Sequence, residues 1–345
     1  MKNKIYIVSW NGLSDAGGVE RVTQYLVNAW SEQYKVIIID YKKMEEFKII
    51  RKILKKHFII DAVVSSLYVQ AIKRKEPESK IVIQGFNCPF VCADVAIAHG
   101  TMRGYKIALE NDLKWHFNQL FEKIGMSKSK RVIAVSDSVK KELLKLYKIS
   151  SDKIDVIVNS VDTEKFYPIK RDANMITTIL YAGRLEFGKG LNEILELANI
   201  IENREKYKFI IATNDENNSS MFAKLKRTKI LVGLKCDEMN LFYNSGDVFF
   251  FPSLYEGFGL VTIEALSAGI PVIGRNLGAI GDLYKRNVDG VDILSGNIEE
   301  NLKKIEGLSN HYKDYEERLK LHKFMQDNFS IKTYNENIKE IWNIK

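Results

Sequence analysis

The sequence has few cysteines and prolines, and it has no long apolar run. Its 345 residues include only three cysteines, Cys88, Cys92 and Cys236, which argues against a disulfide scaffold. The five prolines mark no low-complexity linker, and no tandem repeat is visible. No stretch of about 18 apolar residues occurs that could span a membrane, and the apolar run near the N-terminus is too short for a signal peptide. We therefore expect a cytoplasmic protein with reduced thiols.

Two motifs of nucleotide-dependent enzymes are also absent. No G-x-G-x-x-G follows the first strand-like run, which disfavours a nicotinamide dinucleotide. No Asp-x-Asp occurs anywhere in the chain, so the common metal–diphosphate clamp is missing. We expect no metal site.

The positive charge of the chain is concentrated in two segments. The net charge is +8, and residues 41–58 hold seven Lys or Arg against two Glu, while residues 102–131 hold seven against three acidic residues. The remaining residues together are close to neutral, so the protein is not basic throughout. This distribution fits no recognisable nucleic-acid reading motif, and we expect no nucleic-acid partner.

Short β-rich runs alternate with helical patterns along the whole chain, which predicts α/β architecture. The pattern restarts once, so we expect two Rossmann-like, doubly wound domains facing each other across a cleft, over residues 1–168 and 169–329. The last stretch, about 330–345, is amphipathic and is expected to return to the first domain. The runs expected to be strands are 4–9, 35–40, 59–66, 80–84, 94–100, 131–136, 153–158, 176–183, 207–213, 229–233, 247–253 and 271–274.

Open α/β sheets bind ligands at the carboxyl ends of their strands, so the residues there are the candidates for chemistry. After the first strand, Gly17 and Gly18 open a helix whose free N–H groups suit a phosphate, although a plain turn and helix cap would look the same. His99 ends a later strand; a single histidine there is either structural or part of the site.

The stretch "GRLEFGKG", residues 183–190, nearly matches a phosphate loop. Gly190 stands where that loop needs a Ser or Thr hydroxyl for Mg²⁺, which counts against an ATPase. Arg184 and Lys189 nevertheless place two cations at a strand end, where they could neutralise a diphosphate without a metal. The alternative is a solvated charge pair.

Two glutamates lie eight residues apart after another strand, in "FFFPSLYEGFGLVTIEALSAGIPVI". Glu256 precedes a helix and Glu264 lies within it, and carboxylates accept hydrogen bonds from vicinal sugar hydroxyls. Gly257 and Gly259 let backbone N–H groups approach a ligand closely.

These pieces together resemble the family 4 retaining glycosyltransferases of the GT-B fold. The resemblance is carried by "GGVER", "HG" at 99–100, "VIAVSDSVKKEL", "VIVNSVDTEKF", "YAGRLEFGKG" and the E-x7-E motif from Glu256 to Glu264, in that order. It covers nearly the whole chain, and the E-x7-E motif is highly specific.

The resemblance implies a role for each matched residue. Arg184 and Lys189 would bind the nucleotide diphosphate, Glu264 the ribose hydroxyls, and Glu256 the donor sugar. The backbone of Gly257, Phe258, Gly259 and Leu260 would contact the same sugar, Gly17 and Gly18 the distal phosphate, and His99 the sugar near its reacting carbon. No cofactor is implied beyond the nucleotide sugar as co-substrate. Retention would proceed by front-face attack, without a covalent glycosyl-enzyme.

The resemblance thus implies a metal-independent hexosyltransferase that uses a nucleotide-diphosphate sugar, with UDP as the expected nucleotide. The N-terminal domain would bind the acceptor, a glycan or a lipid-linked sugar, as in bacterial surface polysaccharide or glycolipid synthesis. The alternatives are an epimerase or phosphorylase of the same fold and, less favoured, a phosphate-loop ATPase or GTPase. The two basic segments further suggest docking on an anionic membrane, so we expect a peripheral protein on the inner face of the cytoplasmic membrane.

Overall fold

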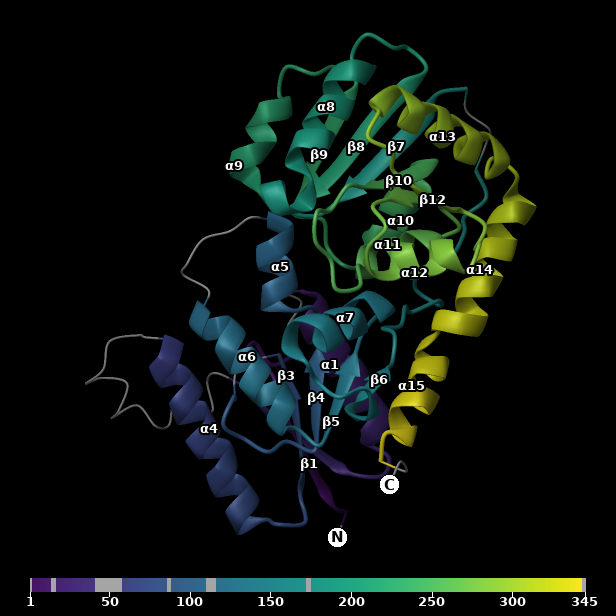
Figure 1. The fold of residues 1–345 in the computed structure, drawn as a ribbon. Coiled ribbons are helices and arrows are strands. Elements are labelled where there is room, and N and C mark those ends of the chain that lie inside the picture. The colour runs from purple at the N-terminus through teal and green to yellow at the C-terminus, as the bar shows by residue number, and fades with distance from the viewer. Residues whose placement is uncertain are drawn as a thin grey trace. The chain divides into compact units, whose positions relative to one another are not determined.

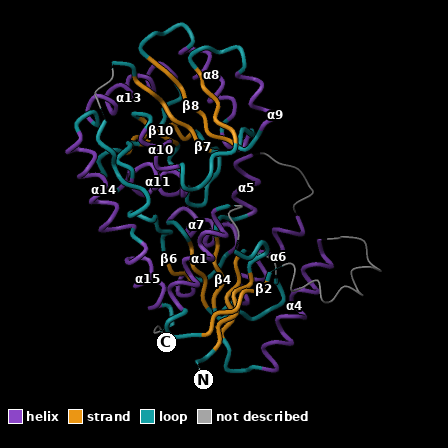
Figure 2. The backbone as a smooth tube through the Cα atoms, turned by 180° about the vertical axis from the view of Figure 1, so that it is seen from behind, coloured by secondary structure: helices purple, strands orange, loops and turns teal. Residues whose placement is uncertain are grey.

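The computed structural model describes residues 2–13, 17–40, 58–85, 88–109, 116–171 and 175–342, without the side chains of 58–61, 116 and 117. The chain forms two compact units, Met1–Asn159 with Tyr334–Lys345, and Ser160–Thr333. Each unit contains a six-stranded parallel sheet with helices on both faces (Figure 1, Figure 2). The prediction of two Rossmann-like α/β domains is confirmed. The division falls between Asn159 and Ser160, ahead of the expected position at residue 168.

The sheet of the first unit has the strand order β2-β1-β3-β4-β5-β6. Its strands are short apolar runs because helices cover both faces of a parallel sheet. The chain starts in β1, adds β2 on one side and then continues on the other side with β3. The topological switch point, where such sheets bind ligands, therefore lies between β1 and β3. The strands are β1 Lys4–Val8, β2 Lys35–Ile39, β3 Lys80–Gln84, β4 Val95–Ala98, β5 Arg131–Ala134 and β6 Ile154–Val156.

One strand prediction in this unit is wrong. Residues 59–66 belong to the helix α4, Phe58–Lys75. A short apolar run cannot be assigned to a strand or a helix by periodicity alone, and here it continues into "LYVQAIKRK" to give a helix of five turns. The other helices of this unit are α1 Gly18–Trp30, α5 Met102–Leu109, α6 His116–Lys128 and α7 Asp137–Glu142. The basic run 41–57 lies outside the described residues.

The second unit has the strand order β12-β11-β10-β7-β8-β9, so its switch point lies between β7 and β10. Its strands are β7 Thr177–Ala182, β8 Tyr207–Thr213, β9 Thr228–Val232, β10 Val248–Phe251, β11 Val272–Gly274 and β12 Val291–Ile293. Its helices are α8 Leu191–Ile201, α9 Glu216–Ser219, α10 Met239–Asn244, α11 Leu260–Ser267, α12 Gly278–Lys285, α13 Ile298–His311 and α14 Tyr315–Phe329. The main core cluster packs α8 and α13 against the sheet.

The C-terminal helix α15, Ile331–Glu340, packs on the first unit through its amphipathic face. Tyr334 meets Tyr25 with ring centroids 6.2 Å apart, and Trp342 meets Trp30 at 5.4 Å. The ammonium of Lys80 lies 4.0 Å from the centroid of the Trp342 ring. Burial of these aromatic rings and the cation–π contact hold the end of the chain against the first sheet.

A buried arginine organises the second unit at the end of its sheet opposite the switch point. Arg318 of α14 donates to the carbonyls of Ile169 (3.0 Å), Ala268 (3.0 Å) and Gly269 (3.2 Å), and to the side-chain oxygen of Asn244. Burial lowers the pKa of Arg318 to about 10, so the guanidinium stays charged at neutral pH.

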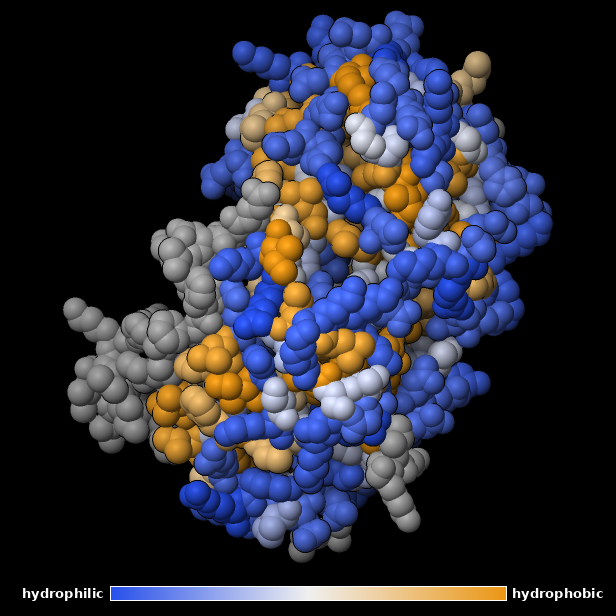
Figure 3. Space-filling view, in the orientation of Figure 1, coloured by the Kyte–Doolittle hydropathy of each residue, from blue (hydrophilic) through white to orange (hydrophobic). Residues whose placement is uncertain are grey.

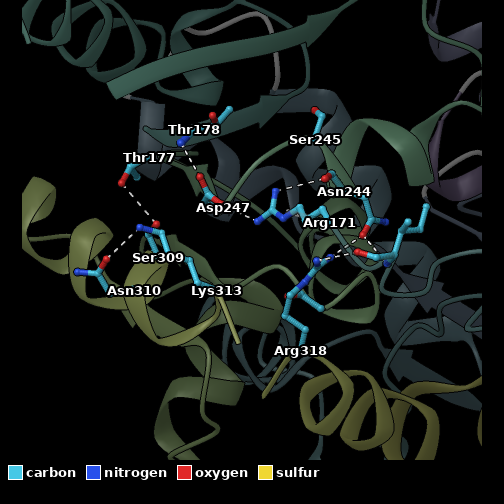
Figure 4. Close-up of polar contacts among 12 residues, drawn as sticks. Arg171, Thr177, Thr178, Asn244, Ser245, Asp247, Ser309, Asn310, Lys313 and Arg318 are labelled. Atoms are coloured by element: carbon cyan, nitrogen blue, oxygen red, sulfur yellow. Dashed lines mark hydrogen bonds and ion pairs between the residues drawn. The ribbon is translucent and has the colours of Figure 1, made fainter. Parts of the chain in front are cut away.

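A second guanidinium extends this cluster. Arg171 binds the backbone of Asn244 at 3.2 Å and the carboxylate of Asp247 at 2.6 Å, and both guanidinium groups point toward Asn244 (Figure 4). Asp247 in turn accepts the N–H of Thr178 at the start of β7. The cluster thus joins the segment after Ser160, the end of α11, α14 and the sheet.

Among the described residues, no helix is both long enough and apolar enough to cross a bilayer.

We predict that Arg318→Met destabilises the unit 160–333 by roughly 3–5 kcal/mol, because four buried acceptors would lose a charged donor at once. The matched control is Arg286→Met, which changes an exposed arginine near the Phe324 ring and should shift the free energy of unfolding by less than about 0.5 kcal/mol. Urea unfolding, monitored by hydrogen exchange of β7 and α11, measures the change in the free energy of unfolding for both variants. Equal effects of the two substitutions would contradict the assignment.

Candidate functional site

Most of the predicted site residues lie at the switch point of the second unit. The loop after β7 carries Arg184 and Lys189, and the loop after β10 carries Glu256 and the glycines that lead into α11. The two strands are adjacent and parallel, so their carboxyl ends meet at one edge of the sheet.

Gly190 explains why residues 183–190 do not form a phosphate loop. Its φ is +80°, and a Cβ at this position would lie 2.5 Å from the carbonyl oxygen of Pro252. A Ser or Thr side chain therefore has no room here, and the Mg²⁺-binding hydroxyl of a phosphate loop cannot be accommodated. The loop after β10 occupies that space instead, which brings Lys189 close to Glu256.

The two cations of this loop differ in their surroundings. Lys189 Nζ lies 2.9 Å and 3.1 Å from the two carboxylate oxygens of Glu256, and both side chains are partly buried. Arg184 is 68% exposed and pairs with Glu186 at 3.0 Å. The Tyr181 hydroxyl donates to the Arg184 carbonyl at 2.7 Å and steadies the backbone beneath it. The structure thus offers an exposed guanidinium and an ammonium that is already paired with a glutamate.

The backbone after Glu256 leads directly into the start of α11. Gly259 has φ +90° and precedes α11, whose first N–H groups have no acceptor within the helix. Phe258 is buried, and its carbonyl accepts the N–H of Ala279 at 2.8 Å. The Phe258 side chain therefore belongs to the core, and only the backbone of this segment can serve a ligand.

Glu264 is more enclosed than the sequence suggests. It is 3% exposed, and the hydroxyl of Tyr243 donates to one of its carboxylate oxygens at 2.9 Å. Tyr243 lies at the end of α10 with its ring against Phe166 and Phe249. Nothing in the sequence pattern marked Tyr243 as part of this site, because its partner is 21 residues away.

The predicted residues of the first unit follow the carboxyl ends of its strands β1 and β4. Gly17 adopts an extended conformation directly before α1, and Gly18 is the first residue of that helix. The first turn already holds a carboxylate, since Glu20 is buried and accepts a hydrogen bond from the Asn11 side chain at 2.6 Å. A phosphate at this helix end would therefore meet N–H groups and a fixed negative charge together.

His99 follows β4 and is tied to β3. Its Nε2 lies 2.7 Å from Gln84 Oε1, and burial lowers the pKa of His99 to about 4 although the ring keeps some exposed surface. The imidazole is therefore neutral near pH 7. The residues just after His99 are also fixed, because the N–H of Met102 donates to Glu122 at 2.7 Å.

Glu122 of α6 is a buried carboxyl group that sequence reasoning missed. Burial raises its pKa to about 7, while the Tyr147 hydroxyl and the Met102 N–H oppose that rise by hydrogen bonding to it. Glu122 thus anchors the start of α5 through the hydrogen bond from the Met102 N–H.

The described residues contain no group of three His, Cys, Asp or Glu side chains placed to hold a metal ion. Cys88, Cys92 and Cys236 form no disulfide, and burial raises the pKa of the Cys88 thiol to about 12.

Two family models match the chain, one after the other. The model described as Glycosyltransferase Family 4 matches residues 16–165, and the model described as Glycosyl transferases group 1 matches residues 163–324. Together they span residues 16–324, and each contains the predicted site residues of its unit.

Curated relatives and solved structures agree with this assignment. The chain is 28% identical to the capsular polysaccharide biosynthesis glycosyltransferase CapM of Staphylococcus aureus over 61% of this chain and 60% of that protein. It is 31% identical to the UDP-Gal:alpha-D-GlcNAc-diphosphoundecaprenol alpha-1,3-galactosyltransferase of Escherichia coli over 49% and 48%. The chain spans about half the length of the curated relatives it matches.

The fold matches over the full length. The sucrose-phosphate synthase of Thermosynechococcus elongatus superposes with a TM-score of 0.77 over 99% of this chain and 98% of that one, at 13% identity. Identity this low shows the fold alone. With both family models matched in sequence, the chain belongs to the family 4 glycosyltransferases, and its two parallel-sheet units are the Rossmann-like domains of the GT-B fold.

Proposed function

We propose that this glycosyltransferase moves a hexose-type sugar from a UDP-sugar to a glycan or lipid-linked acceptor, with retention of configuration and without a metal. The observation that carries the proposal is the set of groups at the β7–β10 switch point. Two cations, two carboxylates and the N-terminus of α11 suit the diphosphate, ribose and sugar of one ligand. The E. coli relative, whose name includes UDP-Gal and a diphosphoundecaprenol acceptor, supports both substrate classes.

Each group has a distinct task in this proposal. Arg184 and Lys189 bind the diphosphate, and Arg184 is exposed enough to reach it by a change of side-chain rotamer. Glu264 accepts the ribose hydroxyls, with its orientation fixed by Tyr243. Glu256 and the backbone of 257–260 bind the donor sugar, and Lys189 can keep Glu256 oriented while it meets a phosphate oxygen, because an ammonium has three protons to donate.

In the first unit, Gly17 and Gly18 would contact the distal phosphate, and His99 the donor sugar. Glu20 limits how closely a phosphate can approach the start of α1, so the contact there is expected from backbone N–H groups rather than from charge.

The chemical step needs little beyond positioning and charge. The bond between the anomeric carbon and the diphosphate oxygen breaks, and the acceptor oxygen forms its bond on the same face of the sugar. The acceptor proton passes to the departing diphosphate oxygen. Arg184 and Lys189 stabilise the charge that develops on that oxygen, which is the role a metal has in other enzymes of this kind.

We also propose that the first unit docks on an anionic membrane, where a lipid-linked acceptor would be presented. Apolar surface gathers over α4 and α6 (Figure 3), and the exposed apolar side chains of α4, α5 and α6 are Val63, Leu67, Ile107 and Leu120. Cations on α5, on α6 and just after it accompany them, which is the composition of an interfacial surface.

The structure corrects part of this surface. Phe121 and Met126 also lie in the second basic segment, but they are buried in the unit and cannot enter a membrane. Trp115, Phe117 and Lys114 lie outside the described side chains, as does the first basic segment, 41–58. The proposal therefore rests on Ile107, Leu120 and the lysines near them.

We predict that the purified protein transfers sugar from a UDP-sugar in excess EDTA. A panel of nucleotide sugars, screened first by thermal shift, identifies the donor, and NMR of the product reads the anomeric configuration. We expect unchanged turnover in EDTA and the configuration of the donor. Complete loss of turnover that only Mg²⁺ or Mn²⁺ restores would contradict the proposal of metal-free transfer. A product with inverted configuration would exclude front-face attack. ATP hydrolysis without sugar transfer would instead favour the ATPase alternative.

We predict that Glu264→Ala and Arg184→Ala each weaken binding of free UDP by roughly 10- to 150-fold, since losing a charge-assisted hydrogen bond costs about 1.5–3 kcal/mol. Glu256→Ala should mainly lower turnover with the sugar donor. Arg204→Ala, which removes an arginine paired with Glu299 away from the loops after β7 and β10, is the control and should leave the affinity unchanged. Calorimetry measures each. Unchanged affinity in both Glu264→Ala and Arg184→Ala would refute the placement of the nucleotide.

We predict that the wild-type protein sediments with vesicles rich in anionic lipid at low salt and is released at high salt. Changing Lys114, Lys123, Lys128 and Lys130 together to Gln should abolish binding, because each well-placed cation contributes about 1 kcal/mol at a charged surface. The same change at Lys208, Lys224, Lys226 and Lys229 of the second unit removes equal charge and serves as the control. Failure of the wild type to bind, or equal effects of both sets, would contradict docking through α5 and α6.

A further inference from the structure

Three side chains at the carboxyl ends of β1, β3 and β4 and one on α1 form one hydrogen-bonded chain in the first unit. His99 Nε2 lies 2.7 Å from Gln84 Oε1, Gln84 Nε2 donates to Thr23 Oγ1, and Thr23 Oγ1 lies 3.2 Å from Ser9 Oγ. Ser9, Thr23 and Gln84 are buried. The chain links the strand ends to α1, which carries Thr23.

The direction of this chain follows from the single proton of the Thr23 hydroxyl. That hydroxyl donates to the carbonyl of Val19 at 2.9 Å, as threonines in helices commonly do. Its oxygen must then accept from its other neighbours, so Ser9 and the amide nitrogen of Gln84 are donors. The Gln84 carbonyl is therefore the end that faces His99. If the Gln84 amide were flipped, its carbonyl oxygen would face the Thr23 oxygen, and both atoms would be acceptors.

The position of the proton on the His99 ring follows from the orientation of the Gln84 amide. A carbonyl oxygen only accepts, so Nε2 must carry a hydrogen. Burial keeps the pKa of His99 near 4, so near neutral pH the ring holds one proton. That proton is on Nε2, and Nδ1 presents a lone pair. Within the part of the chain that the structure describes, Nδ1 has no hydrogen-bond partner.

We propose that Gln84 is a positioning residue that fixes His99 as the neutral imidazole protonated on Nε2, so that His99 meets the substrate only as a hydrogen-bond acceptor through Nδ1. The part that concerns the substrate rests on the proposed function. The group that Nδ1 recognises must donate a proton, which makes it a hydroxyl of a sugar. A phosphate oxygen at neutral pH cannot fill this role, because it only accepts.

This assignment separates His99 from Arg184 and Lys189. A protonated histidine would add positive charge for the diphosphate and could act as a general acid. A neutral ring with its only N–H committed to Gln84 does neither. It selects for a hydroxyl and orients it, which is a specificity task rather than a charge-stabilising one.

The state of the ring can be measured without any substrate. Long-range ¹H–¹⁵N correlation spectra of the full-length protein distinguish the two neutral tautomers and the charged ring, and His99→Gln identifies the signal by its loss. We expect a protonated Nε2 and an unprotonated Nδ1 that persist from about pH 8 to pH 5. A ring protonated on Nδ1, or one charged at pH 6, would overturn the proposal.

Gln84→Glu tests the positioning role. A carboxylate next to Nε2–H favours the charged ring, so the pKa of His99 should rise, and protonation of Nδ1 should remove the acceptor as the pH falls. We expect kcat/KM of this variant to be lowered by about 10-fold at pH 6 and to recover toward pH 8, since one hydrogen bond is affected. Gln70→Glu on α4, whose side chain donates to the Phe90 carbonyl at 2.8 Å, is the control and should leave the His99 signals unchanged. An unshifted His99 titration in Gln84→Glu would also overturn the proposal.

The hydroxyl belongs either to the donor sugar or to the acceptor, and His99→Ala separates the two. If His99→Ala lowers the rate of donor hydrolysis without acceptor and the rate of sugar transfer equally, the hydroxyl is on the donor. A loss confined to transfer places it on the acceptor. No loss in either removes the substrate contact. A wild-type protein without transferase activity but with the expected ring spectrum would refute the proposed function and leave the tautomer assignment standing.

Discussion

The fixed position of α11 is the constraint on which the second unit depends. Its start is set by Gly259 and by the hydrogen bond from Ala279 to the Phe258 carbonyl. Its end is set by Arg318, which binds the carbonyls of Ala268 and Gly269 just beyond the helix. A helix held at both ends has little freedom to slide or rotate, so Glu264 and the first amides of α11 keep one geometry. The same Arg318 also binds Ile169, which follows the start of the unit.

The first unit uses side-chain hydrogen bonds for the same purpose. Ser9, Thr23 and Gln84 come from three different elements, and none is charged. A neutral chain of this kind can be buried at low cost when every member is satisfied. In the same unit, Glu122 accepts hydrogen bonds from the Met102 N–H and the Tyr147 hydroxyl, which fixes the start of α5. The carboxyl ends of the strands in this unit are thus fixed by side chains that need not contact a ligand.

The sequence predicted the sheets well, because parallel strands between helices read as short apolar runs and the glycines mark the turns that leave them. It failed at 59–66, where an apolar run continues into a helix. Motif residues such as Glu256 and Lys189 could be found, but their mutual pairing could not. Gln84, Tyr243 and Arg318 escaped notice because their partners are far away in sequence, and only the fold brings them together.

The ion pair between Lys189 and Glu256 has a consequence for which ligands can bind beside it. A small anion that attracts Lys189 away leaves the partly buried Glu256 without its counter-charge, and that loss opposes binding. A nucleotide sugar brings phosphate oxygens and hydroxyl groups together, so both partners are satisfied in the same event. Under the proposed function, the pair therefore favours ligands that carry a sugar beside a diphosphate.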